Sequence, residues 1–182
     1  MNRDEALILL KQHISRDSLL KHSLAVESIM REVAEFLGED IELWRLTGLL
    51  HDIDFQETEA DLSKHGLVAE IILKELVDPK IIHAIKSHNF ENTGINPEGK
   101  MEITLIAADA ISGLIIAAAL VKPEKKLSLV TVDSIKNAFK KKGFAAGSNR
   151  ENIKRIEEFI PLINFFELSL KGLNKIASEL NL

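Results

Sequence analysis

Cysteine is absent from this 182-residue sequence. Its absence excludes thiolate zinc sites, iron–sulfur clusters, redox dithiols and cysteine nucleophiles. A chain of this length buries roughly 70% of the surface that its unfolded form exposes, so it needs no disulfides to fold. Any metal ion bound by this protein must therefore be held by nitrogen and oxygen atoms.

Basic residues are outnumbered, since 23 basic and 28 acidic side chains give a net charge of −5. A general nucleic-acid binder needs a net basic surface, so a long nucleic acid is not an expected partner. The first residues carry acidic side chains before any apolar run, unlike a signal or transit peptide. We therefore expect a cytoplasmic protein.

Glycine and proline are also few, with nine and four residues, and no repeat or low-complexity block interrupts the chain. The pattern predicts one all-α domain over residues 1–182 with eight to ten helices, comprising a metal-bearing core at about 19–120 and a C-terminal helical extension at about 121–182. Capping residues and apolar periodicity place helices at 3–13, 17–38, 40–51, 64–77, from 79 onward, at 103–121, 132–142, 150–159 and 162–180. Asp17, Ser63 and the Asp78-Pro79 pair are the expected start signals. Leu127–Val132 is the one candidate strand.

The longest apolar run, Ile103–Val121, contains a single charged residue, Asp109. Its length would span a membrane, but an aspartate near the middle would cost roughly 2.5–3.5 kcal/mol in a bilayer. A helix buried in a globular core fits the run better, so no membrane association is expected. A buried carboxylate needs a cation or several hydrogen bonds.

Four of the six histidines lie on apolar helical faces or runs, namely His22, His51, His65 and His88. One such histidine is more often an ordinary core residue, but four of them accompanied by Asp52 and Asp109 favour a cation site. Imidazole and carboxylate donors suit divalent iron, manganese, cobalt, nickel, zinc or magnesium and do not distinguish among them. His13 and His83 are expected to lie outside this site.

The ordered set of His22, the His51-Asp52 pair in Gly-Leu-Leu-His-Asp-Ile-Asp, and Asp109 in Ala-Ala-Asp-Ala resembles the HD superfamily of metal-dependent phosphohydrolases. The resemblance covers roughly residues 19–120. The whole chain is also similar to uncharacterised bacterial and archaeal proteins described as predicted HD-domain hydrolases. The resemblance implies an all-α fold of the HD type in which these four residues bind a metal ion.

Members of that superfamily with two metal ions have further histidines between the His-Asp pair and the last aspartate, where His65 and His88 stand here. The resemblance then implies that Asp52 bridges two ions, which would activate a water for in-line attack on a phosphate ester. The motif often ends in glycine, whereas this chain has Asp54. Asp52 and Asp54 are the predicted catalytic residues. Asp54 would handle a proton, and the alternative is a loop-capping or solvated acid.

Two other functions remain open. Some proteins with similar ligand sets are di-iron oxygenases, and a metal-stabilised module could bind nucleotides without turnover. The chain contains no tyrosine, and no feature of it demands oxygen chemistry. Hydrolysis of a nucleotide or another small phosphate ester is therefore the preferred prediction.

Basic charge is concentrated in residues 122–155, which carry a net charge of +7, while the rest of the chain carries −12. The glycine-flanked loop Gly143–Arg150 leads into a predicted helix, whose free amides could hold a phosphate. Lys122, Lys142, Asn149 and Arg150 are the predicted substrate-binding residues. The alternative is a solvated face whose lysines complete a helix C-terminus. The expected partner is a small phosphorylated substrate such as a nucleotide, and the oligomeric state is left open.

Overall fold

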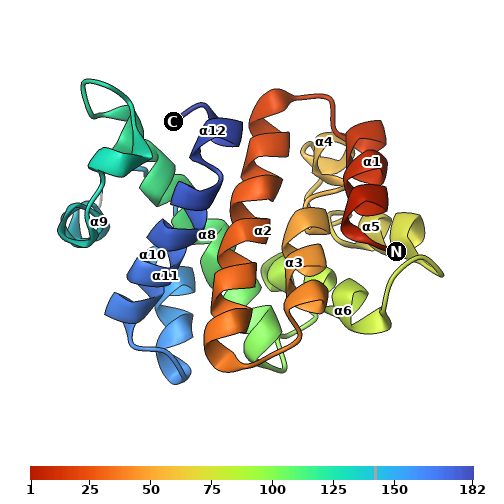
Figure 1. The fold of residues 1–182 in the computed structure, drawn as a ribbon. Helices are drawn as coiled ribbons and strands as arrows, with labels where there is room; N and C mark the ends of the chain where they lie inside the picture. The colour runs from red at the N-terminus through yellow and green to blue at the C-terminus, as the bar shows by residue number, and fades with distance from the viewer. Residues whose placement is uncertain (142) are drawn as a thin grey trace.

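The computed structural model describes residues 1–141 and 143–182, and every regular element among them is helical (Figure 1). In chain order they are α1 (Arg3–His13), α2 (Asp17–Leu37), α3 (Ile41–Leu50), α4 (Phe55–Thr58), α5 (Leu67–Leu73), α6 (Pro79–His88), α7 (Phe90–Thr93), α8 (Lys100–Leu120), α9 (Val132–Lys140), α10 (Arg150–Lys154), α11 (Leu162–Lys175) and α12 (Ala177–Leu180), with 3₁₀ turns at Leu127–Leu129 and Arg155–Glu158. The predicted all-α class is confirmed. The single turns α4 and α7 add to the helices that the sequence predicted.

Several helix ends follow from local signals in the sequence. The Asp40 side chain accepts a hydrogen bond from the Leu43 N–H at the start of α3, and Asp78 caps α6 with Pro79 in its first turn. Gly38 ends α2 in a left-handed conformation with φ of 71°. Asp17 differs from its expected role because it is the first residue of α2, where it pairs with Lys21 at 2.7 Å.

Other boundaries differ from the prediction. The helix expected over 64–77 is confined to α5, because Ser63 bonds to Asp61 and Gly66 turns the chain with φ of 89°. The candidate strand at Leu127–Val132 begins instead as a 3₁₀ turn. The helix expected over 150–159 continues as 3₁₀ after α10, and the one over 162–180 breaks between α11 and α12. Lys142 lies outside the described residues.

The core is built around the two longest helices, α2 and α8, which pack against each other (Figure 1). Helix α3 comes very close to α2 because Gly48 has no side chain: a Cβ there would lie 2.9 Å from the Cα of Glu27. Gly172 of α11 similarly faces the Ser28 carbonyl, 2.9 Å from where its Cβ would be. These close contacts fix the two neighbouring helices against α2.

Helix α8 is long and apolar enough to cross a membrane by length and composition, with a mean hydropathy of 2.2. Most of that apolar window, 67%, is buried inside the protein, as expected for a core helix. Its buried residues join the larger apolar cluster with α2 and the C-terminal helices, while a second cluster joins α1, α3, α5 and α6. Asp109, in the middle of α8, is half-buried.

Candidate metal centre

The six side chains that the sequence proposes as metal ligands come together at one place in the fold. They arrive from separate segments: His22 from α2, His51 and Asp52 from the end of α3, His65 from the loop before α5, His88 from the last residue of α6 and Asp109 from α8.

Asp52 lies between two pairs of histidines and faces both with different oxygens. Its Oδ2 is 3.5 Å from Nε2 of His22 and 3.4 Å from Nε2 of His51. Its Oδ1 is 3.3 Å from Nε2 of His65 and 3.6 Å from Nε2 of His88. Asp109 extends the first group, with its Oδ1 3.1 Å from Nε2 of His22. The six residues thus form two ligand groups that share one carboxylate.

The protein orients all four imidazole rings through their Nδ1 atoms. Each Nδ1 has its own partner: the Gly48 carbonyl for His51 at 2.8 Å, Oδ1 of Asp54 for His65 at 2.8 Å, the Ile85 carbonyl for His88, and Oγ of Ser112 for His22 at 3.2 Å. The Ser112 hydroxyl donates to the Asp109 carbonyl, so its oxygen accepts from His22. Every Nδ1 therefore carries the proton, and every Nε2 offers a lone pair when its ring is neutral.

These lone pairs face one another in a way that fits bound cations. Nε2 of His22 lies 3.2 Å from that of His51, and Nε2 of His65 lies 3.0 Å from that of His88. Two neutral imidazoles in this arrangement repel unless a positive charge lies between them. Two nitrogens bound tetrahedrally at metal–nitrogen distances of about 2.0–2.1 Å would be about 3.3 Å apart. The donor set and its spacing therefore fit divalent metal ions.

The pKa values within the site reflect the competition between burial and nearby carboxylates. Burial opposes protonation of His22, but Asp109 and Asp52 outweigh it and raise its pKa to about 9. Burial also opposes protonation of His65, whose pKa Asp52 and Asp54 raise to about 9. His51 differs, since complete burial lowers its pKa to about 4. Each histidine pair thus holds a positive charge when no metal is bound, and a metal ion must displace protons to enter.

Asp54 has a different environment from the one the sequence predicted. Its Oδ1 accepts from Nδ1 of His65, while its Oδ2 accepts from the N–H groups of Gly66 and Ala69 at 2.8 and 2.9 Å. The residue is 1% exposed and does not line the cavity at the metal ligands. A carboxylate held on both oxygens in this way does not fit the predicted handling of a substrate proton. Asp54 instead caps α5 and positions His65.

The contacts of Arg150 likewise do not fit its predicted phosphate-binding role. Among the described residues, its guanidinium donates to backbone carbonyls, including those of Ala138, Phe144, Ala145 and Ser148. These bonds hold the loop that precedes α10, and they leave the group committed to the protein.

The other predicted substrate residues differ in how close they lie to the metal ligands. Oδ1 of Asn149 accepts from the N–H groups of Glu151 and Asn152, so these amides are not free for phosphate. The Asn149 side chain nevertheless lines a cavity beside His22. Lys122 lines another hollow, together with Ser134. It lies beyond the end of α8, about 20 Å from Asp109 along the helix axis. Lys142 lies outside the described residues.

Two cavities are each lined by both His22 and Asp109, and a smaller hollow also reaches His22. One, of about 340 Å³, is lined by Leu19, His22, Asp52, Phe55, Leu62, His65, His88, Asn89 and Asp109. The other, of about 500 Å³, shares His22 and Asp109 and continues along α8. Sequence reasoning missed Ser112 and Asn89. Ser112 is a polar residue one turn after Asp109 in an apolar helix, and Asn89, next to His88, donates to the His65 carbonyl at 3.0 Å.

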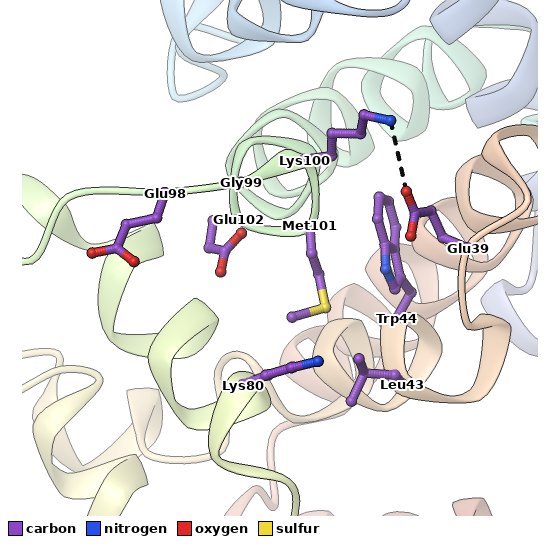
Figure 2. Close-up of a pocket in the computed structure, with 9 residues that line it drawn as sticks. All are labelled: Glu39, Leu43, Trp44, Lys80, Glu98, Gly99, Lys100, Met101 and Glu102. Atoms are coloured by element: carbon purple, nitrogen blue, oxygen red, sulfur yellow. Dashed lines mark ion pairs between the residues drawn. The ribbon is translucent and has the colours of Figure 1, made fainter.

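A further cavity, of about 410 Å³, lies away from the metal ligands (Figure 2). Trp44 and Met101 line it, and charged residues border it, with Lys100 paired to Glu39 at 3.7 Å. It lies at the N-terminal ends of α6 and α8, whereas His88 is at the C-terminal end of α6. His83, as expected, faces outward from the metal ligands, with its Nδ1 3.3 Å from Glu102.

A comparison with known protein families identifies the arrangement. The model of the HD domain matches residues 19–113, which include all six candidate ligands. The chain belongs to the HD domain family. An uncharacterised protein of Methanocaldococcus jannaschii is 32% identical over 168 residues, covering 86% of this chain and 93% of that protein. The family and the two ligand groups together indicate a metal-dependent hydrolase centre.

Other HD-domain relatives are much longer. Ribonuclease Y of Lawsonia intracellularis is 34% identical over 97 residues, which cover 53% of this chain but 18% of that protein. Ribonuclease Y of Streptococcus sanguinis is 30% identical over 138 residues, or 74% of this chain and 25% of that protein. The chain therefore spans about a fifth to a quarter of the length of these relatives. No solved structure shows significant similarity.

Proposed function

We propose that this HD-domain protein hydrolyses the phosphate ester of a nucleotide or another small molecule, using one or two divalent metal ions. The observation that carries this proposal is the position of Asp52, with one oxygen toward His22 and His51 and the other toward His65 and His88. A shared carboxylate of this kind can hold two cations side by side.

The side chains supply a preorganised centre. Each histidine ring is held by its Nδ1 partner, so its Nε2 is aimed before any metal ion arrives. Metal ions bound there would polarise a phosphoryl oxygen and lower the pKa of a water molecule. Leu19, Phe55 and Leu62 border the adjoining cavity with apolar surface, and its volume suits a small molecule.

The comparisons favour hydrolysis over the two alternatives. Relatives named ribonuclease Y share the HD segment, and that name describes cleavage of phosphate esters. The acidic chain and the limited coverage of ribonuclease Y argue for a small substrate in place of a long RNA. A cytoplasmic location remains part of this proposal.

The proposal is tested by measuring metal content and activity together. Protein reloaded without oxygen with each candidate metal is assayed against phosphate monoesters, nucleotides and dinucleotides. His51→Ala and Asp109→Ala should lose bound metal and activity, whereas His83→Ala, a histidine outside the site, should retain both. Full metal content in both ligand variants, or no hydrolysis with any metal, would contradict the proposal. Oxygen consumption would favour the oxygenase, and tight nucleotide binding without turnover would favour the regulatory module.

A further inference from the structure

The cavity that continues from His22 and Asp109 has a floor of very small residues. Ala110, Gly113 and Ala117 lie three and four residues apart on one face of α8, and all three line this cavity. A Cβ at Gly113 would lie 3.2 Å from Oγ of Ser148 on the opposite wall. Gly113 therefore lets Ser148 approach α8 closely, and the cavity between α8 and the segment before α10, called the groove below, is lined on the α8 side by these small residues.

The opposite wall offers uncharged hydrogen-bonding groups. Ser148, Asn149 and Asn152 line it. Asn149 uses its Oδ1 to cap α10, which leaves its amide N–H groups available. Within residues 1–141 and 143–182, the Ser148 hydroxyl and the Asn152 side-chain amide form no hydrogen bond. These groups can bind a ligand that has hydroxyl or amide groups.

The described side chains that line the groove are mostly uncharged. None of the described residues that line it, or the adjoining cavity at the metal ligands, is lysine or arginine. Lys21, beside His22 in a neighbouring hollow, is paired with Asp17 at 2.7 Å, and Arg150 is bound to backbone carbonyls. Asp109 contributes negative charge at the groove entrance. Among the described lining residues, a second phosphate group would therefore meet no lysine or arginine.

We infer that this groove binds the alcohol part of the substrate, a neutral sugar or nucleoside, and that the substrate is a phosphate monoester in preference to a diphosphate or triphosphate. The inference rests on the proposed function, because the phosphate must lie at the metal ligands for the alcohol to extend along α8. The residues that determine specificity are then Ala117, which sets the space, and Asn152, which hydrogen bonds to the alcohol part.

The first test fills the groove. Ala117→Leu should lower kcat/KM for adenosine monophosphate and glucose monophosphate by about tenfold or more, because the added side chain occupies the space of the alcohol part. Methyl phosphate has no such part, so its kcat/KM should change by less than about twofold. Ala60→Leu, the same substitution at an exposed alanine that does not line this cavity, is the matched control and should resemble the unmodified protein. An equal loss for all three esters, or no loss for any, would overturn the inference.

The second test compares charge and hydrogen bonding. Adenosine diphosphate should be hydrolysed with a kcat/KM at least about tenfold lower than that for adenosine monophosphate. Asn152→Leu should lower kcat/KM for adenosine monophosphate and glucose monophosphate without changing that for methyl phosphate. Equal or better use of the diphosphate would overturn the inference. If no ester is hydrolysed with any metal, the proposed function fails. Calorimetry with adenosine or glucose then tests ligand binding in the groove separately. Binding of adenosine or glucose that Ala117→Leu abolishes supports the groove, and no binding to the unmodified protein overturns it.

Discussion

Replacing Asp54 with asparagine should disable one of the two ligand groups without touching a metal ligand. The carboxylate accepts three hydrogen bonds, one from His65 and two from the backbone N–H groups of Gly66 and Ala69. An asparagine has only one oxygen, so it can accept on one side while its NH₂ group faces a donor on the other. One buried interaction must therefore be lost or reversed.

The least costly response changes the tautomer of His65. If the asparagine oxygen keeps the two backbone donors, its NH₂ faces Nδ1 of His65, which must then become the acceptor. The proton moves to Nε2, where the lone pair for a metal ion was. We expect a loss of about 1–3 kcal/mol in the free energy of unfolding and about 10–100-fold weaker binding at the group formed by Asp52, His65 and His88.

The assay is a titration of metal-free protein with Mn²⁺, with stoichiometry measured by native mass spectrometry and stability by urea denaturation. Asp54→Asn should retain binding at His22 and His51 and lose the second ion at moderate metal concentrations. Asp61→Asn is the matched control, since Asp61 is an exposed acid in the loop that carries His65. Normal metal binding and stability together with lost activity would refute the positioning role and restore a role in proton transfer.

Two other predictions concern pH and the loop before α10. Metal-free protein should be most stable near pH 6.5. The stability that protonated His22 and His65 contribute is complete below their unfolded pKa of 6.5 and is lost as pH rises through about 9. The stability that neutral His51 contributes is lost as pH falls from 6.5 through about 4. Urea denaturation across pH 4–10 measures this, and stability that kept rising above pH 9 would contradict it. Arg150→Ala should cost about 2–3 kcal/mol of unfolding free energy because several carbonyls lose a charged donor, whereas the exposed Lys154→Ala should cost under about 1 kcal/mol. Unchanged stability with a raised KM for a phosphate ester would instead assign Arg150 to the substrate.

Helix boundaries with strong local signals were predictable because their causes lie within a few residues. Asp40, the Asp78-Pro79 pair and Gly38 all act on neighbouring backbone groups. Ser63 shows the limit of such reasoning. It resembles a helix cap, but Asp61 takes its hydroxyl, and α5 is instead capped by Asp54, twelve residues before Gly66.

The candidate ligands were predictable for a different reason. A histidine or an aspartate on an apolar helical face must be compensated, and the order of His22, His51, Asp52 and Asp109 resembles a known family. The grouping of the ligands was not predictable from composition or spacing alone. It depends on where α2, α3, α6 and α8 place their side chains, and Gly48 sets the approach of two of these helices.

The sequence by itself determined an all-α protein without thiolate chemistry, the locally capped helices and the residue types able to bind a metal ion. Only the tertiary structure decided which acids are free to act. Asp52 faces two histidine pairs, whereas Asp54, two residues later, is fully occupied by His65 and backbone N–H groups. Arg150 is likewise committed to the loop it holds. The physical reason is that a polar group's role depends on which partners satisfy it, and here those partners come from distant segments of the chain.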